Sequence, residues 1–220
     1  MCFSATVSFG GAAVLSTLGI ASMACSRTPA QRVLSGIPIV FSIQQFTEGV
    51  LWMALQHPAW TKYEHIATYG FLVFAQMVWP VYVPFAMLLF ERDPKLKKII
   101  AGLLATCILL ASYIGYCLYQ YPVSAEVGYH HIKYNLDFAL ANAWYYGLLY
   151  FLPTILASVI SSVKRLRWLG YLFFISYVVA RLMFHYFEIS VWCFFGSLIS
   201  SIIIGMIWKF NKESKLAAQS

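Results

Sequence analysis

Ionisable and strongly polar side chains interrupt two long apolar stretches of the sequence, and they are the first candidates for chemistry. Gln44 and Gln45 precede Glu48 by about one helical turn, so the three residues share a helix face. Arg181 and His185 lie in a second apolar stretch. A charge inside a bilayer costs about 3 kcal/mol on insertion scales, so chains keep few of them without a use. We expect these five residues to line a ligand pocket.

The depths of Glu48 and Arg181 also match. At 1.5 Å per residue, Glu48 lies about 12 Å and Arg181 about 9 Å from the outer ends of their stretches. One interpretation is an ion pair that offsets the burial of both charges and fixes the packing. The other is a polar cavity, open to the outside, that binds a ligand or a metal.

A metal site is a further hypothesis. Arg181, His185 and Glu188 are spaced i, i+4, i+7, which predicts one stripe on a helix. The His185-x-x-Glu188 pair would supply two ligands and Glu48 a third. Zinc with three protein ligands and a water is catalytic in type. The alternative is that His185 is hydrogen-bonded in the helix packing.

Two further features are expected on the outer side of the membrane. Cys2 and Cys193 form a candidate thiol pair, and they would form a disulfide in an oxidising compartment. The alternative is that both are buried, inert thiols. The segment 120–138 is the longest loop on this side, and it is either a lid over the helices or a linker on the membrane interface.

Composition defines the class of protein. Of 220 residues, 61% are apolar and only 10% are charged, and the mean hydropathy is +0.72. A soluble domain is about 25% charged, so an ordinary soluble protein is excluded. The net charge is +7, but the basic residues fall in short loops between apolar spans, which indicates membrane topology rather than nucleic-acid binding. We expect membrane lipid as a partner.

The hydropathy pattern predicts an all-α, polytopic integral membrane protein with seven transmembrane helices. A transmembrane helix needs about 20 residues, so seven helices leave no room for a soluble domain. We expect a single domain over residues 1–208 and a short basic cytoplasmic tail over 209–220. The predicted spans lie near 5–25, 33–56, 66–90, 99–119, 139–163, 168–187 and 189–208.

Loop charges predict the orientation. Twelve of the Lys and Arg residues lie in loops and a tail on one side, whereas only Lys62 and Lys133 lie on the other. Because basic residues remain in the cytoplasm, the N-terminus is expected outside and the C-terminus in the cytoplasm. The expected location is the bacterial cytoplasmic (inner) membrane.

Three segments carry a resemblance to a known family. Residues 1–5 (MCFSA), 44–49 (QQxxEG) and 192–195 (WCFF) resemble a family of uncharacterised bacterial multi-pass membrane proteins of similar length. The resemblance implies seven spans and no particular activity. It places the following residues among the family's hallmark positions: Cys2, Gln44, Gln45, Glu48 and Cys193.

A second comparison is with seven-helix membrane hydrolases such as the alkaline ceramidases. Those enzymes carry an HxxxH pair in the last helix, and this chain has no such pair. The leading hypothesis is therefore a non-enzymatic protein that binds a small ligand, an ion or a partner in an outward-facing pocket, as a sensor or a transporter. The alternatives are a metal-dependent membrane hydrolase and a structural or assembly subunit.

Overall fold

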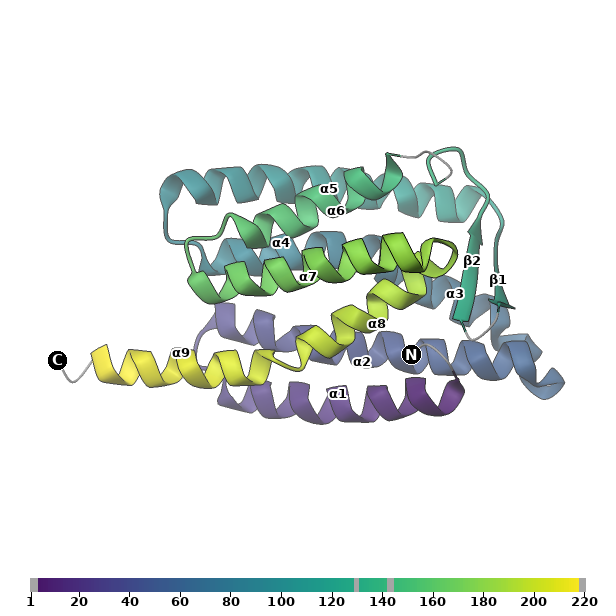
Figure 1. The fold of residues 1–220 in the computed structure, drawn as a ribbon, viewed down its shortest axis with the longest axis horizontal. Helices are drawn as coiled ribbons and strands as arrows, with labels where there is room; N and C mark the ends of the chain where they lie inside the picture. Colours follow the sequence, from purple (N-terminus) through teal and green to yellow (C-terminus); the bar gives the residue numbers. More distant parts are fainter. Residues whose placement is uncertain (1–3, 129–130, 142–144, 218–220) are drawn as a thin grey trace.

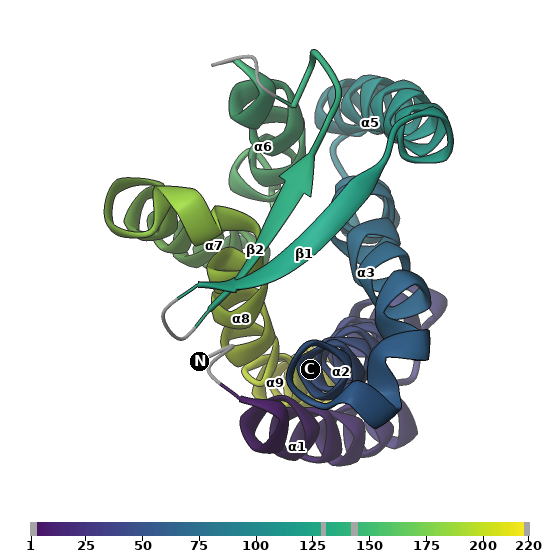
Figure 2. The same ribbon diagram turned by 90° about the vertical axis from the view of Figure 1, so that its right-hand side faces the viewer.

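The computed structural model describes residues 4–128, 131–141 and 145–217, and it is mostly helical. The helices run along the long axis of the molecule (Figure 1). Seen end-on, they form an irregular ring (Figure 2). The elements are α1 (Ala5–Cys25), α2 (Pro29–Gln56), η1 (Pro58–Tyr63), α3 (Glu64–Val73), η2 (Phe74–Val78), α4 (Trp79–Phe90), α5 (Pro94–Gln120), β1 (Val123–Gly128), β2 (His131–Leu136), α6 (Tyr146–Val159), α7 (Lys164–Met183), η3 (His185–Phe187), α8 (Glu188–Ser200) and α9 (Ile203–Ala217).

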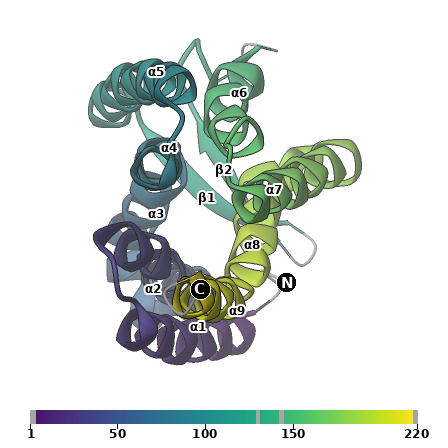
Figure 3. The same ribbon diagram turned by 90° about the vertical axis from the view of Figure 1, so that its left-hand side faces the viewer.

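The two ends of the bundle differ in chemistry. The antiparallel strands β1 and β2 cross one end, which we call the hairpin end (Figure 2). The opposite end, which we call the basic end, carries the α1–α2, α4–α5 and α6–α7 connections and α9 (Figure 3). The twelve basic residues that the sequence assigns to the cytoplasm lie in these connections, in the first five residues of α2, α5 and α7, or in α9.

Helices α1 and α2 pack closely because small residues line their interface. The hydroxyl groups of Ser16 and Ser42 lie 2.5 Å apart, and those of Ser22 and Ser35 lie 2.8 Å apart. A Cβ atom at Gly19 would lie 2.5 Å from the side chain of Ile39. Small residues and hydroxyl pairs are the usual means of joining helices in a lipid environment.

A buried carboxylate joins two loops at the basic end. Glu91, which is 3% exposed, accepts hydrogen bonds from the backbone N–H of Ser162 at 2.8 Å and from the Ser162 hydroxyl group at 2.5 Å. It also accepts from the backbone N–H groups of Arg92 and Asp93. Burial alone would raise the pKa of Glu91, but these hydrogen bonds outweigh it and lower the pKa to about 2.

Within the described residues, five helical segments are long and apolar enough to cross a membrane: Ala5–Cys25, Pro58–Phe90, Pro94–Gln120, Lys164–Met183 and Glu188–Glu213. The predicted spans over 33–56 and 139–163 also contain helices, α2 and α6, which do not meet this measure. Helix α2 carries polar side chains in its middle. Helix α6 has 14 residues and is about 21 Å long, less than the roughly 30 Å of a bilayer core.

The structure adds detail to the predicted span and tail at the C-terminal end. The span expected over 189–208 is interrupted at 201–202, where α8 ends and α9 begins after a turn. Side-chain hydroxyl groups accompany this break, because Ser200 and Ser201 donate to the carbonyls of Ser197 and Leu198. The segment expected as a short basic tail from residue 209 is helical as far as Ala217.

Candidate functional site

A cavity of about 930 Å³ lies at the hairpin end. Strands β1 and β2 contribute one wall, and η2, α6, α7, η3 and α8 contribute the others. The hairpin crosses this end of the ring in Figure 2. Cavities of roughly 300–1,000 Å³ are typical of small-molecule sites.

Ring contacts fix the hairpin at two places. Tyr134 of β2 stacks on Phe71 of α3, with ring centroids 4.7 Å apart and an interplanar angle of 3°. His131 contacts the rings of Phe184 and Phe187 beside α7, at 5.5 Å and 5.0 Å. The hairpin is therefore attached to helices on both sides of the cavity. The described residues of the segment 120–138, which are 120–128 and 131–138, thus lie across one end of the helices, as a lid would.

An ion pair joins strands β1 and β2. Lys133 and Glu126 are register partners, and the Lys133 ammonium group lies 3.0 Å from the Glu126 carboxylate. The Asn135 amide also donates to Glu126, at 3.2 Å. The hydrogen bond from Lys133, followed by that from Asn135, lowers the pKa of Glu126 below its ordinary value.

A π-helical segment, η2, supplies part of the cavity wall. The Tyr146 hydroxyl group of α6 donates to Gln76 Oε1 at 2.5 Å, and the Tyr150 hydroxyl group donates to the carbonyl of Ala75. Both acceptors belong to η2, and all four residues line the cavity. Single π-turns within α-helices often occur at functional sites, because the extra residue re-aims side chains and carbonyls.

Aromatic rings form the next part of the wall. Tyr150, Phe151 and Trp192 all line the cavity. Trp192 meets Phe151 edge to face at 4.6 Å and Tyr150 at 6.1 Å. Phe151 also packs on Tyr177 of α7, with centroids 3.5 Å apart. This wall offers an apolar surface with few hydrogen-bonding groups.

Arg181 and Glu188 form an ion pair in the cavity lining. The Arg181 Nη1 atom lies 2.6 Å from Glu188 Oε2, and the two side chains are 50% and 14% exposed. The predicted single stripe through Arg181, His185 and Glu188 is wrong. Helix α7 ends at Met183, and the φ of −133° at Phe184 breaks the helix before η3. The pair meets across this turn rather than along one helix face.

The expected ion pair between Glu48 and Arg181 is not formed. Both residues are described, and Arg181 pairs with Glu188 instead. Glu48 is fully buried and accepts hydrogen bonds from the Ser190 hydroxyl group at 2.8 Å and from the Gln45 amide at 3.3 Å. These two polar side chains stabilise the carboxylate between α2 and α8.

Gln44, Gln45 and Glu48 lie behind the cavity rather than in its lining. Gln44 Oε1 accepts a 2.6 Å hydrogen bond from the indole N–H of Trp79. The Cys193 thiol lies beside the Gln44 side chain, and Cys193 is also a lining residue. We call Gln44, Gln45, Glu48, Ser190 and Cys193 the polar ladder, because they join α2 to α8 on successive turns.

Parts of the sequence hypotheses concern positions outside the described structure. The side chain of His185 and the whole of Cys2 lie there, so the zinc site and the thiol pair stay predictions. Among the described side chains, no group of three or more His, Cys, Asp and Glu residues is arranged to hold a metal ion.

Sequence reasoning missed several lining residues. Gln76 had a signal, since it is a strongly polar side chain in the middle of the apolar span 66–90. Trp192 had one in the WCFF segment that carries the family resemblance, whereas Tyr146 and Tyr150 had none, because aromatic residues are common throughout this chain. Their role depends on how α6 and α8 face η2.

The fold defines a class of protein: a helical bundle whose described residues include five segments long and apolar enough to cross a membrane, with a cavity beside the paired strands β1 and β2. The chain belongs to the family of unknown function DUF6629, whose sequence profile matches residues 1–219. Comparisons with curated proteins and with solved structures gave no match.

Proposed function

We propose that this protein is an integral membrane protein that binds a small ligand from the outer side in the cavity beneath β1 and β2. The observation that carries the proposal is the cavity itself, about 930 Å³, with an ion pair and an aromatic wall in its lining. Ligand sites typically combine such an apolar surface with a few placed polar groups.

Charge supports an orientation with the basic end in the cytoplasm. The acids at this end are engaged in local bonds: Glu91 with Ser162, Asp93 with the first turn of α5, and Glu213 with Arg165. Among the described residues, Arg165 has the only ion pair at this end. The remaining basic side chains keep a strong positive excess there, as the positive-inside rule requires.

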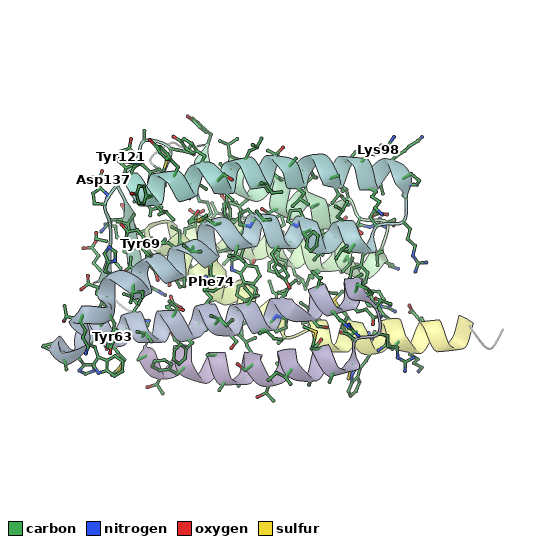
Figure 4. The ribbon with its side chains drawn as sticks, turned by 180° about the vertical axis from the view of Figure 1, so that it is seen from behind. Tyr63, Tyr69, Phe74, Lys98, Tyr121 and Asp137 are labelled. Carbon is green, nitrogen blue, oxygen red and sulfur yellow. The ribbon has the colours of Figure 1, made fainter. Side chains whose placement is uncertain are left out.

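Aromatic side chains support the same placement. At the hairpin end, Tyr116 and Tyr119 of α5 and Trp60 of η1 are exposed. At the basic end, Trp168 and Trp208 are 61% and 63% exposed. Figure 4 shows the two ends, with Tyr63, Tyr121 and Asp137 at one and Lys98 at the other. Tyr and Trp gather at both interfaces of a membrane, which supports our proposal that α2 and α6 also lie in the membrane and bring the number of crossings to seven.

The hydrolase hypothesis needs Glu48, His185 and Glu188 around one metal ion. In this arrangement Glu188 is paired with Arg181, and Glu48 is bonded to Gln45 and Ser190 on the far side of the lining. The observed bonds therefore favour ligand binding over metal-dependent hydrolysis. The cavity likewise favours ligand binding over a purely structural role, in which no such space is needed.

Cysteine accessibility tests the proposal. In a variant without native cysteines, Ile189→Cys places a thiol in the cavity lining, whereas Leu198→Cys places one on the exposed, lipid-facing side of the same helix. A membrane-impermeant methanethiosulfonate reagent, added from outside, is expected to modify the first position and spare the second. Equal protection of both positions, in protein that migrates as a folded monodisperse species, would refute a cavity open to the outside.

A further inference from the structure

We propose that the ligand of this cavity is a zwitterionic amphiphile, with adjacent anionic and cationic groups on an apolar body. The proposal rests on the proposed function, since it names the class of ligand for the same cavity. Two sources share this chemistry: a zwitterionic phospholipid of the outer leaflet, and a water-soluble zwitterion with an apolar side group.

The polar part of the argument comes from Arg181 and Glu188. Only Nη1 of the Arg181 guanidinium is engaged by Glu188 among the described contacts, and half of the side chain is exposed. A guanidinium has further N–H donors in a fixed fork, which suits a phosphate or carboxylate group. The Glu188 carboxylate beside it is an acceptor for an ammonium group. The pair therefore presents a donor fork and a carboxylate side by side, which complements a head group with both charges.

Charge balance argues against a ligand with a net charge. The described charged side chains of the lining are two basic and two acidic residues: Lys133, Asp137, Arg181 and Glu188. Lys133 is already paired with Glu126, and Arg181 with Glu188. An anion near Arg181 would also be near Glu188, and a cation near Glu188 would also be near Arg181. Partial exclusion of water strengthens both repulsions. A neutral zwitterion avoids this cost.

The apolar part of the argument comes from the wall formed by Tyr150, Phe151 and Trp192. The rings meet edge to face, and Trp192 and Tyr150 are 7% and 4% exposed. This surface would take up an acyl chain or an apolar side group. It would also accept an alkylammonium group against a ring face. The cavity therefore offers charged groups at the ion pair and apolar rings in the same lining. This combination suits an amphiphile better than a simple ion.

Native mass spectrometry of the purified full-length protein tests the ligand class. The protein is incubated with phosphatidylethanolamine, with anionic phosphatidylglycerol of the same acyl chains, and with glycerophosphoethanolamine, the deacylated phosphodiester, which carries no net charge at pH 7. We expect wild type to retain phosphatidylethanolamine about tenfold more than phosphatidylglycerol, the size of one charge-assisted contact. Arg181→Gln and Glu188→Gln are each expected to abolish this preference.

Matched variants separate the cavity from lipid bound around the bundle. Arg167→Gln makes the same substitution at an exposed position near the start of α7 and should keep the preference. Arg181→Lys keeps the charge without the fork, so intermediate retention is expected. Thermal unfolding of each variant shows whether a loss reflects misfolding. If Arg181→Gln unfolds at a lower temperature, Glu188→Gln and Arg181→Lys carry the test.

The outcomes distinguish the two proposals. Retention of glycerophosphoethanolamine as strong as that of the whole lipid supports the zwitterion and identifies a water-soluble source. Equal retention of the two lipids, with Ile189→Cys still modified from outside, overturns the zwitterion but leaves the ligand cavity. If Ile189→Cys is protected and no probe is retained, both proposals fail.

Discussion

Removing the charge of Glu91 should show how much this carboxylate contributes to the stability of the basic end. Glu91 receives the hydroxyl group and backbone N–H of Ser162 and two backbone N–H groups from its own loop. Glu91→Gln keeps the shape but removes the charge, and its amide nitrogen would face donors instead of accepting from them. The variant therefore weakens the link between the α4–α5 and α6–α7 connections.

The pKa of Glu91 sets the magnitude. It falls from 4.5 to about 2, and at about 1.4 kcal/mol per unit the upper limit is about 3 kcal/mol. Water at the loop surface screens part of this, which leaves about 1–2 kcal/mol. Because the folded-state pKa is the lower one, the stabilisation is complete above pH 4.5 and is lost as the pH falls through about 2.

Reversible unfolding in mixed micelles, followed by far-UV circular dichroism, measures this effect. Glu91→Gln is expected to lower the free energy of unfolding by about 1–2 kcal/mol at pH 7 and by little near pH 2. Ser162→Ala should show a smaller loss, because the backbone N–H remains. Ser112→Ala, whose hydroxyl group bonds only within α5 at the carbonyl of Ile108, is the control. A loss in Glu91→Gln that is the same at both pH values would show that packing, not charge, stabilises these loops.

Two further substitutions test the packing. Gly19→Ala would place a Cβ atom 2.5 Å from Ile39, so we expect a loss of about 1–3 kcal/mol in the same unfolding assay; Gly102→Ala, with open space around it, should be neutral or slightly stabilising. Trp79→Phe leaves the Gln44 carbonyl oxygen without its 2.6 Å donor, and the expected loss is about 1–3 kcal/mol. A stability equal to that of wild type in either case would mean that the interface relaxes around the change.

Hydropathy predicted much of the fold because apolar length is a direct consequence of bilayer thickness. The turn between α7 and α8 lies at His185–Phe187, next to Glu188, where two of the predicted spans meet. Five spans meet the physical measure for crossing a membrane. The structure adds the breaks, such as the π-segment at Phe74–Val78 and the interruption before Ile203. Breaks depend on local side-chain bonds, which average hydropathy does not record.

The candidate site was less predictable than the fold. Polarity within apolar spans singled out Gln44, Gln45 and Glu48 as pocket residues, whereas the structure buries them outside the cavity lining. Depth alone paired Glu48 with the wrong helix. Depth gives the position along the membrane normal and not the position around the ring. Arg181 instead pairs with the Glu188 carboxylate, which the turn between α7 and α8 brings within 2.6 Å.

Helix α8 connects the structural and ligand-binding interpretations of Glu48, because it contacts both Glu48 and the cavity. One face of this helix presents Ser190 to Glu48, and another presents Trp192 to the cavity. Helix α8 does not continue into a neighbouring α-helix at either end, because η3 precedes Glu188 and a turn follows Ser200. Its position therefore depends strongly on lateral bonds such as those of the polar ladder. Glu48 would then act as a positioning residue, whose neutralisation changes the affinity for ligand without any contact between Glu48 and the ligand.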